Sequence, residues 1–268
     1  MKQDVKVKSY VRKGKLVKNY QRKQDSALVK ATIVAASTLG LTAASYIALK
    51  RRYIGNLDKA AKSIKVNPDI GKVVNKKDIT FVLGGFTKDS TIKNTDPLGQ
   101  ARYIRAELLT PFERKLHEVI ALDHKFTTDN IKDDLVNVAD RSKLIATPLF
   151  KGRNDEAVRL AEEIYSWHIK NPNKPINLIG FSIGGNLGRD VEYILRKKKV
   201  NVKLATLGTA DLKLVPSDKH LNIMGSKDEF NFKLKSRNSV LVNDVKHTPD
   251  SYIKNDDVQR QLKQYLFN

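Results

Sequence analysis

The chain contains the stretch INLIGFSIGG at residues 176–185, where an apolar, strand-like run leads into a glycine-rich turn. A helical pattern follows at once, so Gly-x-Ser-x-Gly falls between a predicted strand and a predicted helix. Gly180 and Gly184 suit this place because the turn is tight and the two elements approach each other closely. The turn lifts the Ser182 hydroxyl above the sheet and aims the Ile183 amide at an oxygen that acquires negative charge. Ser182 is therefore the candidate nucleophile.

From Asp78 to residue 268, short β-branched and aliphatic runs alternate with helical patterns. The predicted strands cover residues 79–83, 119–122, 144–146, 176–179, 202–207, 221–224 and 239–242. The predicted helices cover residues 155–170, 184–199 and 256–266. Alternation of this kind is typical of a parallel sheet with helices on both faces. The sequence therefore predicts an α/β fold with a mostly parallel sheet flanked by helices.

A serine hydroxyl becomes a nucleophile at neutral pH when a base takes its proton and an acid orients that base. In this topology the acid and then a histidine follow the serine, each on a loop after a later strand. Of the five histidines, His247 meets this condition because it follows the predicted strand 239–242 and precedes the last predicted helix. The other four lie before the serine or before the acid: His117, His124, His168 and His220.

Asp228 is the candidate acid, because it follows the predicted strand 221–224 and a glycine-containing turn. Glu229 and Asp211 remain as alternatives. Asp244 lies close to the candidate histidine in sequence, but we expect it to form a turn at the end of the preceding strand.

Stabilising the negative oxygen needs a second amide besides that of Ile183. The predicted strand 79–83 is followed by Gly84-Gly85, and paired glycines let the backbone approach a substrate. The amide of Phe86, or alternatively that of Thr87, is the candidate second donor. A tight turn without this role is the other interpretation of the glycine pair.

Together these features resemble the lipase/esterase-like branch of the α/β-hydrolase superfamily over residues 78–268. The matching stretches are Gly84-Gly85-Phe86, Gly180-Phe181-Ser182-Ile183-Gly184-Gly185, Leu207-Gly208-Thr209-Ala210, Gly225-Ser226-Lys227-Asp228 and His247. Two departures stand out: Ala210 replaces a frequent proline, and no histidine precedes the glycine pair. The resemblance implies hydrolysis of an ester, or less often an amide or thioester, through an acyl-enzyme and with no metal or organic cofactor.

The formal net charge of +21 lies mostly around one uncharged segment. Residues 1–30 hold ten basic and two acidic residues, and residues 50–80 hold nine and three. Between them, residues 31–49 read ATIVAASTLGLTAASYIAL. As a helix this segment would be about 28 Å long, close to the thickness of a bilayer core. We expect a transmembrane helix here, the alternative being an apolar helix docked on the folded domain.

The expected organisation has four parts. Residues 1–30 form a basic segment, with either a hairpin around Lys13-Gly14 or a disordered tail. Residues 31–49 form the apolar helix, residues 50–77 a basic linker with a short amphipathic helix, and residues 78–268 the hydrolase-like domain. Long connections over residues 88–130 and 130–154 are candidate lids. The expected localisation is single-pass membrane association, and the sequence does not fix the side of the membrane.

Expected partners are an acyl ester or lipid substrate and an anionic membrane surface. The chain has no cysteine, which excludes disulfides, cysteine-ligated metal sites and a thiol nucleophile. One alternative is a non-catalytic α/β-hydrolase-like protein that binds or scaffolds membranes. Binding of nucleic acid through the basic N-terminal arm is disfavoured, because no base-reading module is present. The oligomeric state is left open.

Overall fold

A computed structural model describes residues 43–85, 96–124, 153–209, 220–228 and 239–268, the first seven of these as helix backbone. It also describes the backbone of four short strands near the N-terminus, β1 (Val5–Lys6), β2 (Tyr10–Arg12), β3 (Lys15–Val17) and β4 (Gln21–Arg22). β1 pairs with β4, and β2 pairs antiparallel with β3. The second pairing joins the two segments on either side of the predicted hairpin turn, and the turn residues Lys13-Gly14 lie outside the described residues.

The centre of the domain is a six-stranded sheet in the order β10-β9-β8-β7-β5-β6. All five neighbouring pairs are parallel. The strands are β5 (Asp78–Leu83), β6 (His117–Leu122), β7 (Ile176–Phe181), β8 (Val202–Leu207), β9 (His220–Gly225) and β10 (Ser239–Val242). The predicted parallel α/β fold is confirmed. The predicted strand at 144–146 lies outside the described residues.

The chain changes direction across the sheet at β5. After β5 the chain forms β6 on one side, and it then returns to form β7 on the other side of β5. Ligands of open α/β sheets bind beyond the carboxyl ends of the strands at such a switch point. The ends of β5 and β7 therefore mark the place where a functional site is expected.

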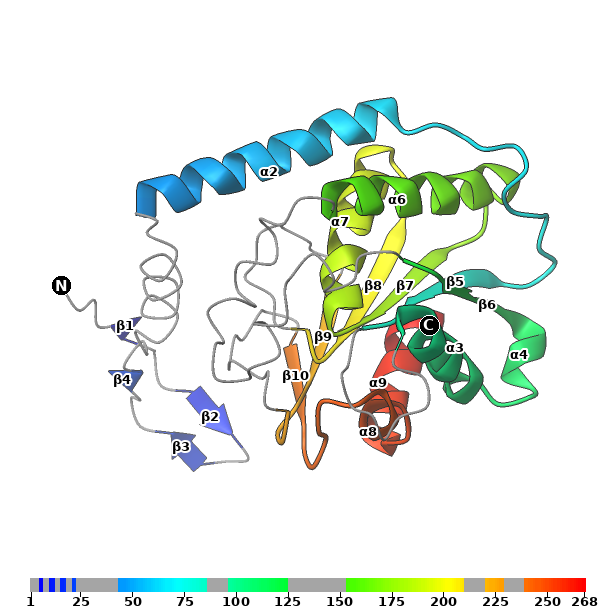
Figure 1. Cartoon of the computed structure of the whole chain (residues 1–268). Helices are drawn as coiled ribbons and strands as arrows, with labels where there is room; N and C mark the ends of the chain where they lie inside the picture. Colours follow the sequence, from blue (N-terminus) through cyan, green and yellow to red (C-terminus); the bar gives the residue numbers. More distant parts are fainter. Residues whose placement is uncertain are drawn as a thin grey trace.

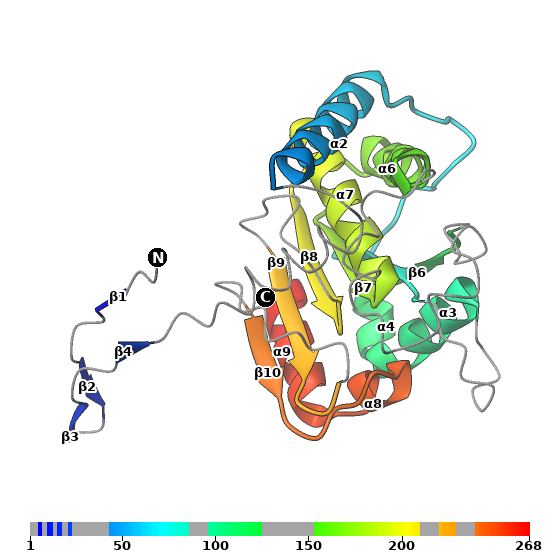
Figure 2. The same ribbon diagram turned by 60° about the vertical axis from the view of Figure 1, so that its left-hand side comes forward.

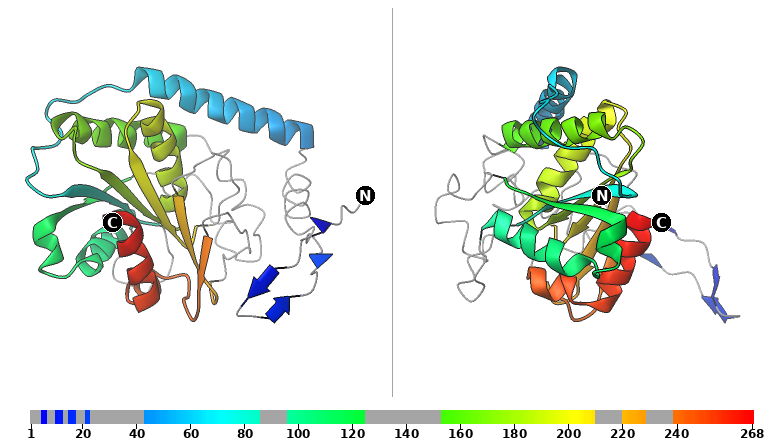
Figure 3. Two further views of the ribbon diagram at one scale, coloured as in Figure 1. Left: turned by 180° about the vertical axis from the view of Figure 1, so that it is seen from behind. Right: turned by 90° about the vertical axis from the view of Figure 1, so that its right-hand side faces the viewer.

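Helices cover both faces of the sheet (Figures 1 and 2). One face carries α2 (Ala43–Ser63), α6 (Arg153–Lys170) and α7 (Ile183–Lys197). The other carries α3 (Pro97–Leu108), α8 (Pro249–Ile253) and α9 (Asp256–Phe267), with the short α4 (Glu113–Leu116) leading into β6. Seen from behind, α2 again lies across the outside of the layer formed by α6 and α7 (Figure 3). α3 lies in the 88–130 connection, where it packs on β5 and β6 as a crossover helix.

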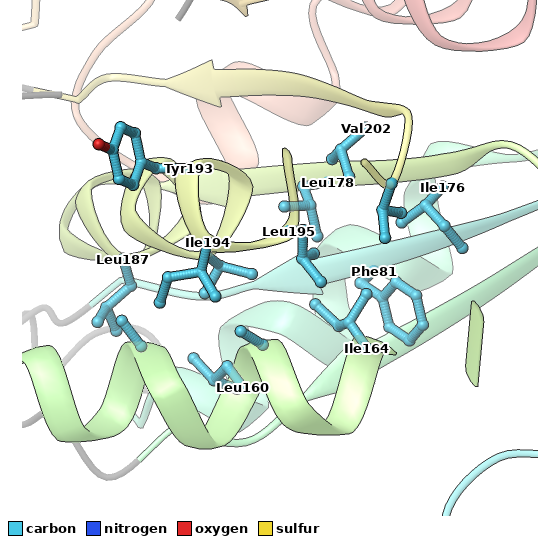
Figure 4. Packing of buried hydrophobic residues seen from close by; sticks show 14 of the residues in the cluster. Phe81, Leu160, Ile164, Ile176, Leu178, Leu187, Tyr193, Ile194, Leu195 and Val202 are labelled. Carbon is cyan, nitrogen blue, oxygen red and sulfur yellow. The ribbon is translucent and has the colours of Figure 1, made fainter. Parts of the chain in front are cut away.

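The larger apolar core lies between the sheet and the helices α2, α6 and α7. Figure 4 shows Leu160 and Ile164 of α6 facing a cluster of side chains from the sheet and from α7. This cluster includes Phe81 of β5, Leu178 of β7 and Leu195 of α7. All five side chains are fully buried. Burial of a large aliphatic or aromatic side chain contributes about 1.5–3 kcal/mol, so this layer fixes α7, and with it the turn that precedes α7.

The transmembrane prediction is wrong. Among the described residues no helix combines the length and the apolar character needed to cross a bilayer. Residues 43–49 of the predicted span belong to α2, which continues through the charged sequence Lys50-Arg51-Arg52 to Ser63; residues 31–42 lie outside the described residues. The prediction of a single-pass membrane protein is therefore corrected.

From residue 50 onward, the buried apolar side chains of α2 face the folded domain. Tyr53, Leu57 and Ala61 recur every four residues, and Ile64 follows directly after the helix; all four are buried in the cluster formed with α6 and α7. This spacing places them on one stripe of the helix. The short amphipathic helix predicted around Leu57 is thus the second half of a longer helix that docks on the sheet's helical layer.

A buried ion pair links α2, α6 and α7. Arg153 Nε donates to Asp190 Oδ2 at 2.7 Å, and its Nη2 donates to the Asn186 carbonyl at 2.9 Å. The Tyr53 hydroxyl donates to the same oxygen of Asp190. The side chains of Arg153 and Asp190 are 3% and 0% exposed, so neither charge has water as an alternative partner.

We predict that Asp190→Asn lowers the free energy of unfolding by about 3–5 kcal/mol, because it leaves the Arg153 charge buried without an anion. Urea unfolding near pH 7 measures the change. Arg260→Ala is the control, since it breaks an ion pair with Asp257 that is more than half exposed on both sides and is expected to cost about 0–1 kcal/mol. Equal losses in the two variants would contradict the prediction.

Candidate active site

The predicted site residues come together at the carboxyl ends of the parallel strands. Ser182 follows β7, Gly84-Gly85 follows β5, Asp228 lies three residues after β9, and His247 lies five residues after β10. Parallel strands end at the same edge of a sheet, so residues far apart in sequence meet there. The strands that bear Ser182 and the glycine pair, β7 and β5, are the two that meet at the switch point.

Ser182 lies in a strained turn between β7 and α7. Its backbone has φ 52° and ψ −120°, a combination that L-residues rarely adopt and that costs about 1–3 kcal/mol. A side chain at Gly184 is excluded, because a Cβ there would lie 2.2 Å from the Gly84 carbonyl oxygen. Thr209 Oγ1 donates to the Ser182 carbonyl at 3.1 Å and holds the turn from the β8 side. Ser182 itself is half-buried.

Ser182, His247 and Asp228 form one hydrogen-bonded row. His247 Nε2 lies 3.0 Å from Ser182 Oγ. His247 Nδ1 lies 3.0 and 2.9 Å from the two carboxylate oxygens of Asp228. A carboxylate only accepts, so these partners assign the proton to Nδ1 and leave Nε2 as the acceptor for the serine proton. Asp228 is 5% exposed, so the carboxylate that orients the ring is shielded from water.

The first predicted oxyanion donor has the expected setting. Ile183 is the first residue of α7, and the first amides of a helix have no acceptor within the helix. The helix dipole adds positive potential at the same place. The amide of Ile183 is therefore available to a negative oxygen bound next to Ser182.

The loop of the second predicted donor is held by two buried side chains. Gly85 N–H donates to Gln100 Oε1 at 3.0 Å, and His124 Nε2 donates to the Gly84 carbonyl at 2.7 Å. Both contacts are made by the same peptide unit, which is thus fixed at its nitrogen and at its oxygen. The amide of Gly85 is occupied, and the predicted donor Phe86, with its alternative Thr87, lies outside the described residues.

Tyr252 of α8 is a site residue that sequence reasoning missed. Its hydroxyl donates to Asp228 Oδ2 at 2.6 Å and accepts from Gly225 N–H at 2.8 Å. Burial, and then the Asp228 charge, raise the pKa of Tyr252 above its ordinary range. The only sequence signal is a tyrosine five residues after the candidate histidine, which by itself does not indicate a contact with the acid.

Asp228 is the acid that the described structure places against His247. Glu229 and Asp211 lie outside the described residues. Asp244 is exposed, has a left-handed φ of 61° and pairs with Lys227 at 2.7 Å. It is the turn residue that the sequence predicts.

The rings of three other histidines, His117, His124 and His220, have hydrogen-bond partners of their own. His220 Nε2 lies 2.7 Å from Thr206 Oγ1, and its Nδ1 accepts from Arg189 at 2.8 Å. Burial and the nearby Arg189 hold the pKa of His220 well below its ordinary value, so this ring stays neutral. His117 pairs with Asp78 at the opposite ends of the strands. Among the residues the structure describes, no group of three or more His, Cys, Asp and Glu side chains forms a metal site.

Comparisons with known proteins give structural likenesses only. No family model matches the chain, and no curated protein sequence matches it significantly. A lipase-esterase related protein from Clostridium acetobutylicum is 14% identical over 73% of this chain and 97% of its own, with a TM-score of 0.43. A Bacillus subtilis carboxylesterase is 12% identical over 81% and 98%, with a TM-score of 0.40. A Trichoderma reesei cutinase is 10% identical over 90% and 97%, with a TM-score of 0.38.

With identities and TM-scores this low, the reaction has to be inferred from the residues of the site. The parallel sheet, its two helical layers and the strand–turn–helix at Ser182 agree with the α/β-hydrolase resemblance found in the sequence.

We predict that Gly208→Ala destabilises the protein at the centre of this site. Gly208 has φ +58°, and a Cβ there would lie 2.7 Å from Asp228 Oδ2 and 3.1 Å from His247 Nδ1. The left-handed backbone alone costs about 1–2 kcal/mol for a residue with a side chain. Urea unfolding measures the loss.

The matched control for this substitution is Gly55→Ala. Gly55 lies within α2, and no atom lies within 4 Å of a Cβ built there. Alanine in a helix interior is favoured over glycine by up to about 1 kcal/mol, so this variant gains stability. The prediction is contradicted if Gly208→Ala and Gly55→Ala change the free energy of unfolding by the same amount in the same direction.

Proposed function

We propose that the protein is a serine hydrolase that cleaves an acyl ester through an acyl-enzyme. The observation that carries the proposal is the 3.0 Å contact between His247 Nε2 and Ser182 Oγ, with His247 Nδ1 turned to Asp228. A nucleophile, a base within hydrogen-bond reach and an acid that orients the base are the parts that acyl transfer requires.

In the first half of the proposed reaction, His247 Nε2 takes the Ser182 proton as Ser182 Oγ bonds to the acyl carbon. The carbonyl oxygen becomes an oxyanion that accepts from the Ile183 amide and from the predicted Phe86 amide. The bond between the acyl carbon and the leaving oxygen then breaks. His247 gives its proton to that oxygen, and an alcohol departs.

In the second half, water replaces the alcohol. His247 takes a proton from water as the water oxygen bonds to the acyl carbon. The bond from that carbon to Ser182 Oγ breaks, and the proton returns to the serine. Asp228 keeps its charge throughout and stabilises the positive imidazole that forms twice in the cycle. No metal or organic cofactor enters these steps.

The proposed substrate class is an acyl ester, including lipid esters. Residues 88–95 and 125–152, which belong to the connections that would enclose an acyl chain, lie outside the described residues. Chain length and the choice between ester, thioester and amide are therefore left to experiment.

We predict that a fluorophosphonate probe labels the wild-type protein and fails to label Ser182→Ala, because the probe reports an activated serine. The control is Ser226→Ala, which removes an exposed hydroxyl close to Asp228 in sequence but outside the row of site residues. Labelling is read by gel fluorescence and intact mass. Equal labelling of wild type and Ser182→Ala would refute the proposal.

We also predict hydrolysis of p-nitrophenyl butyrate or octanoate, with an initial burst of about one equivalent of nitrophenol if deacylation is the slower half. In His247→Ala the rate is expected to fall by about a thousandfold or more, because the serine loses its base. His168→Ala is the control, since His168 lies on α6, away from the site. An active His247→Ala variant would exclude this mechanism, and inactivity of the wild type would favour a non-catalytic protein of the same fold.

A further inference from the structure

Tyr252 is the buried group in contact with Asp228 that a Ser-His-Asp row does not require. Its hydroxyl donates to Asp228 Oδ2 at 2.6 Å, and the same oxygen lies 2.9 Å from His247 Nδ1. The Tyr252 side chain is fully buried. Because Gly225 N–H donates to the phenol oxygen from another side at 2.8 Å, the phenol proton is directed at the carboxylate.

The local structure explains why the tyrosine reaches this carboxylate. His247 is followed by Thr248, the N-cap of α8, which accepts from Ser251 N–H. Ser251 Oγ in turn accepts from Lys246 N–H at 2.8 Å. This closed turn brings Tyr252 of α8 back to the level of His247, so two side chains five residues apart both donate to Asp228.

We propose that Tyr252 is a positioning residue of the catalytic site: it fixes the Asp228 carboxylate, takes up part of its charge, and so sets how firmly His247 holds a proton. The proposal rests on the proposed function. A carboxylate that accepts a second strong hydrogen bond attracts the imidazolium proton less.

The charged groups around Tyr252 are few in the described structure. Asp228 and His247 lie on the buried side of α8, and Phe181 of β7 packs its ring edge-on against Tyr252. On the exposed side of α8, the Tyr103 hydroxyl of α3 donates to Asp250, which also pairs with Lys254. Beyond Asp228, the neighbouring ion pair of Lys227 and Asp244 is open to solvent. Asp228 is thus the charge through which Tyr252 acts.

The test compares Tyr252→Phe with wild type in the rate of fluorophosphonate labelling between about pH 5 and 9. The expected result is an acid limb moved to higher pH by about half to one unit, because Asp228 then draws the His247 proton more strongly. The plateau rate is expected to fall about tenfold, since the carboxylate has lost a hydrogen bond that fixes it. Tyr103→Phe is the matched control: it also removes a tyrosine–aspartate hydrogen bond on α8, and its profile is expected to coincide with wild type.

A double-mutant cycle shows whether Tyr252 acts through Asp228. In an Asp228→Asn background, Tyr252→Phe is expected to leave the remaining labelling rate and its pH profile unchanged. The proposal is overturned if the acid limb of Tyr252→Phe equals that of wild type, or if the substitution has the same effect with and without the Asp228 charge.

Two further measurements separate the possible failures. Thermal unfolding verifies that Tyr252→Phe is folded. If it is not, 3-fluorotyrosine is introduced at position 252, because it keeps the shape of tyrosine and donates a stronger hydrogen bond. The acid limb of the labelling profile is then expected to move to lower pH. The proposal is overturned if the acid limb of the 3-fluorotyrosine protein lies at the same pH as that of wild type. Labelling of Ser182→Ala would instead overturn the proposed function itself, because the nucleophile would then lie elsewhere.

Discussion

The loop after β5 and the first turn of α7 are in direct backbone contact, and the candidate site depends on that contact. The Gly84 carbonyl lies so close to Gly184 that a Cβ at position 184 would be 2.2 Å from the oxygen. This approach fixes the distance between the serine turn and the loop of the second predicted oxyanion donor. His124 and Gln100 hold the same peptide from its other sides. The two loops, which follow different strands, are thereby held in a fixed position relative to each other. Stabilisation of an oxyanion by preorganised amide donors requires such a fixed position.

Two buried aspartates, Asp190 and Asp228, have different hydrogen-bond and ion-pair partners. Asp190 is matched by the cation of Arg153, and the pair anchors helices to one another. Asp228 is bonded, in the part of the chain that the structure describes, by a histidine and a phenol. Each receives a tyrosine hydroxyl, which supplies a strong hydrogen bond without a second charge. The difference leaves Asp228 able to support a positive charge that appears and disappears on His247.

Much of the site could be predicted from the sequence, because one part of it is a short contiguous motif and the other parts follow in a fixed order along the chain. Gly-x-Ser-x-Gly between a strand and a helix indicates Ser182, and the order of later strands and loops indicates Asp228 and His247. The contacts of Tyr252 and Gln100 could not be predicted, because they depend on how separate helices pack. The membrane prediction failed for a related reason. The uncharged run ends at Lys50, whereas α2 continues past this charge and buries a stripe of apolar residues that includes Tyr53.

The docking of α2 bears on how short a working form of the protein can be. A chain that began at residue 78 would keep every strand of the main sheet and every candidate site residue. It would nevertheless uncover the face of α6 and α7 on which Leu57 and Ile64 pack, and it would remove the Tyr53 hydroxyl from Asp190. The part of the chain that holds the candidate site residues is therefore shorter than the part that forms the apolar core. The packing of Tyr53, Leu57, Ala61 and Ile64 thus extends the folded unit to residues that precede the first strand of the sheet.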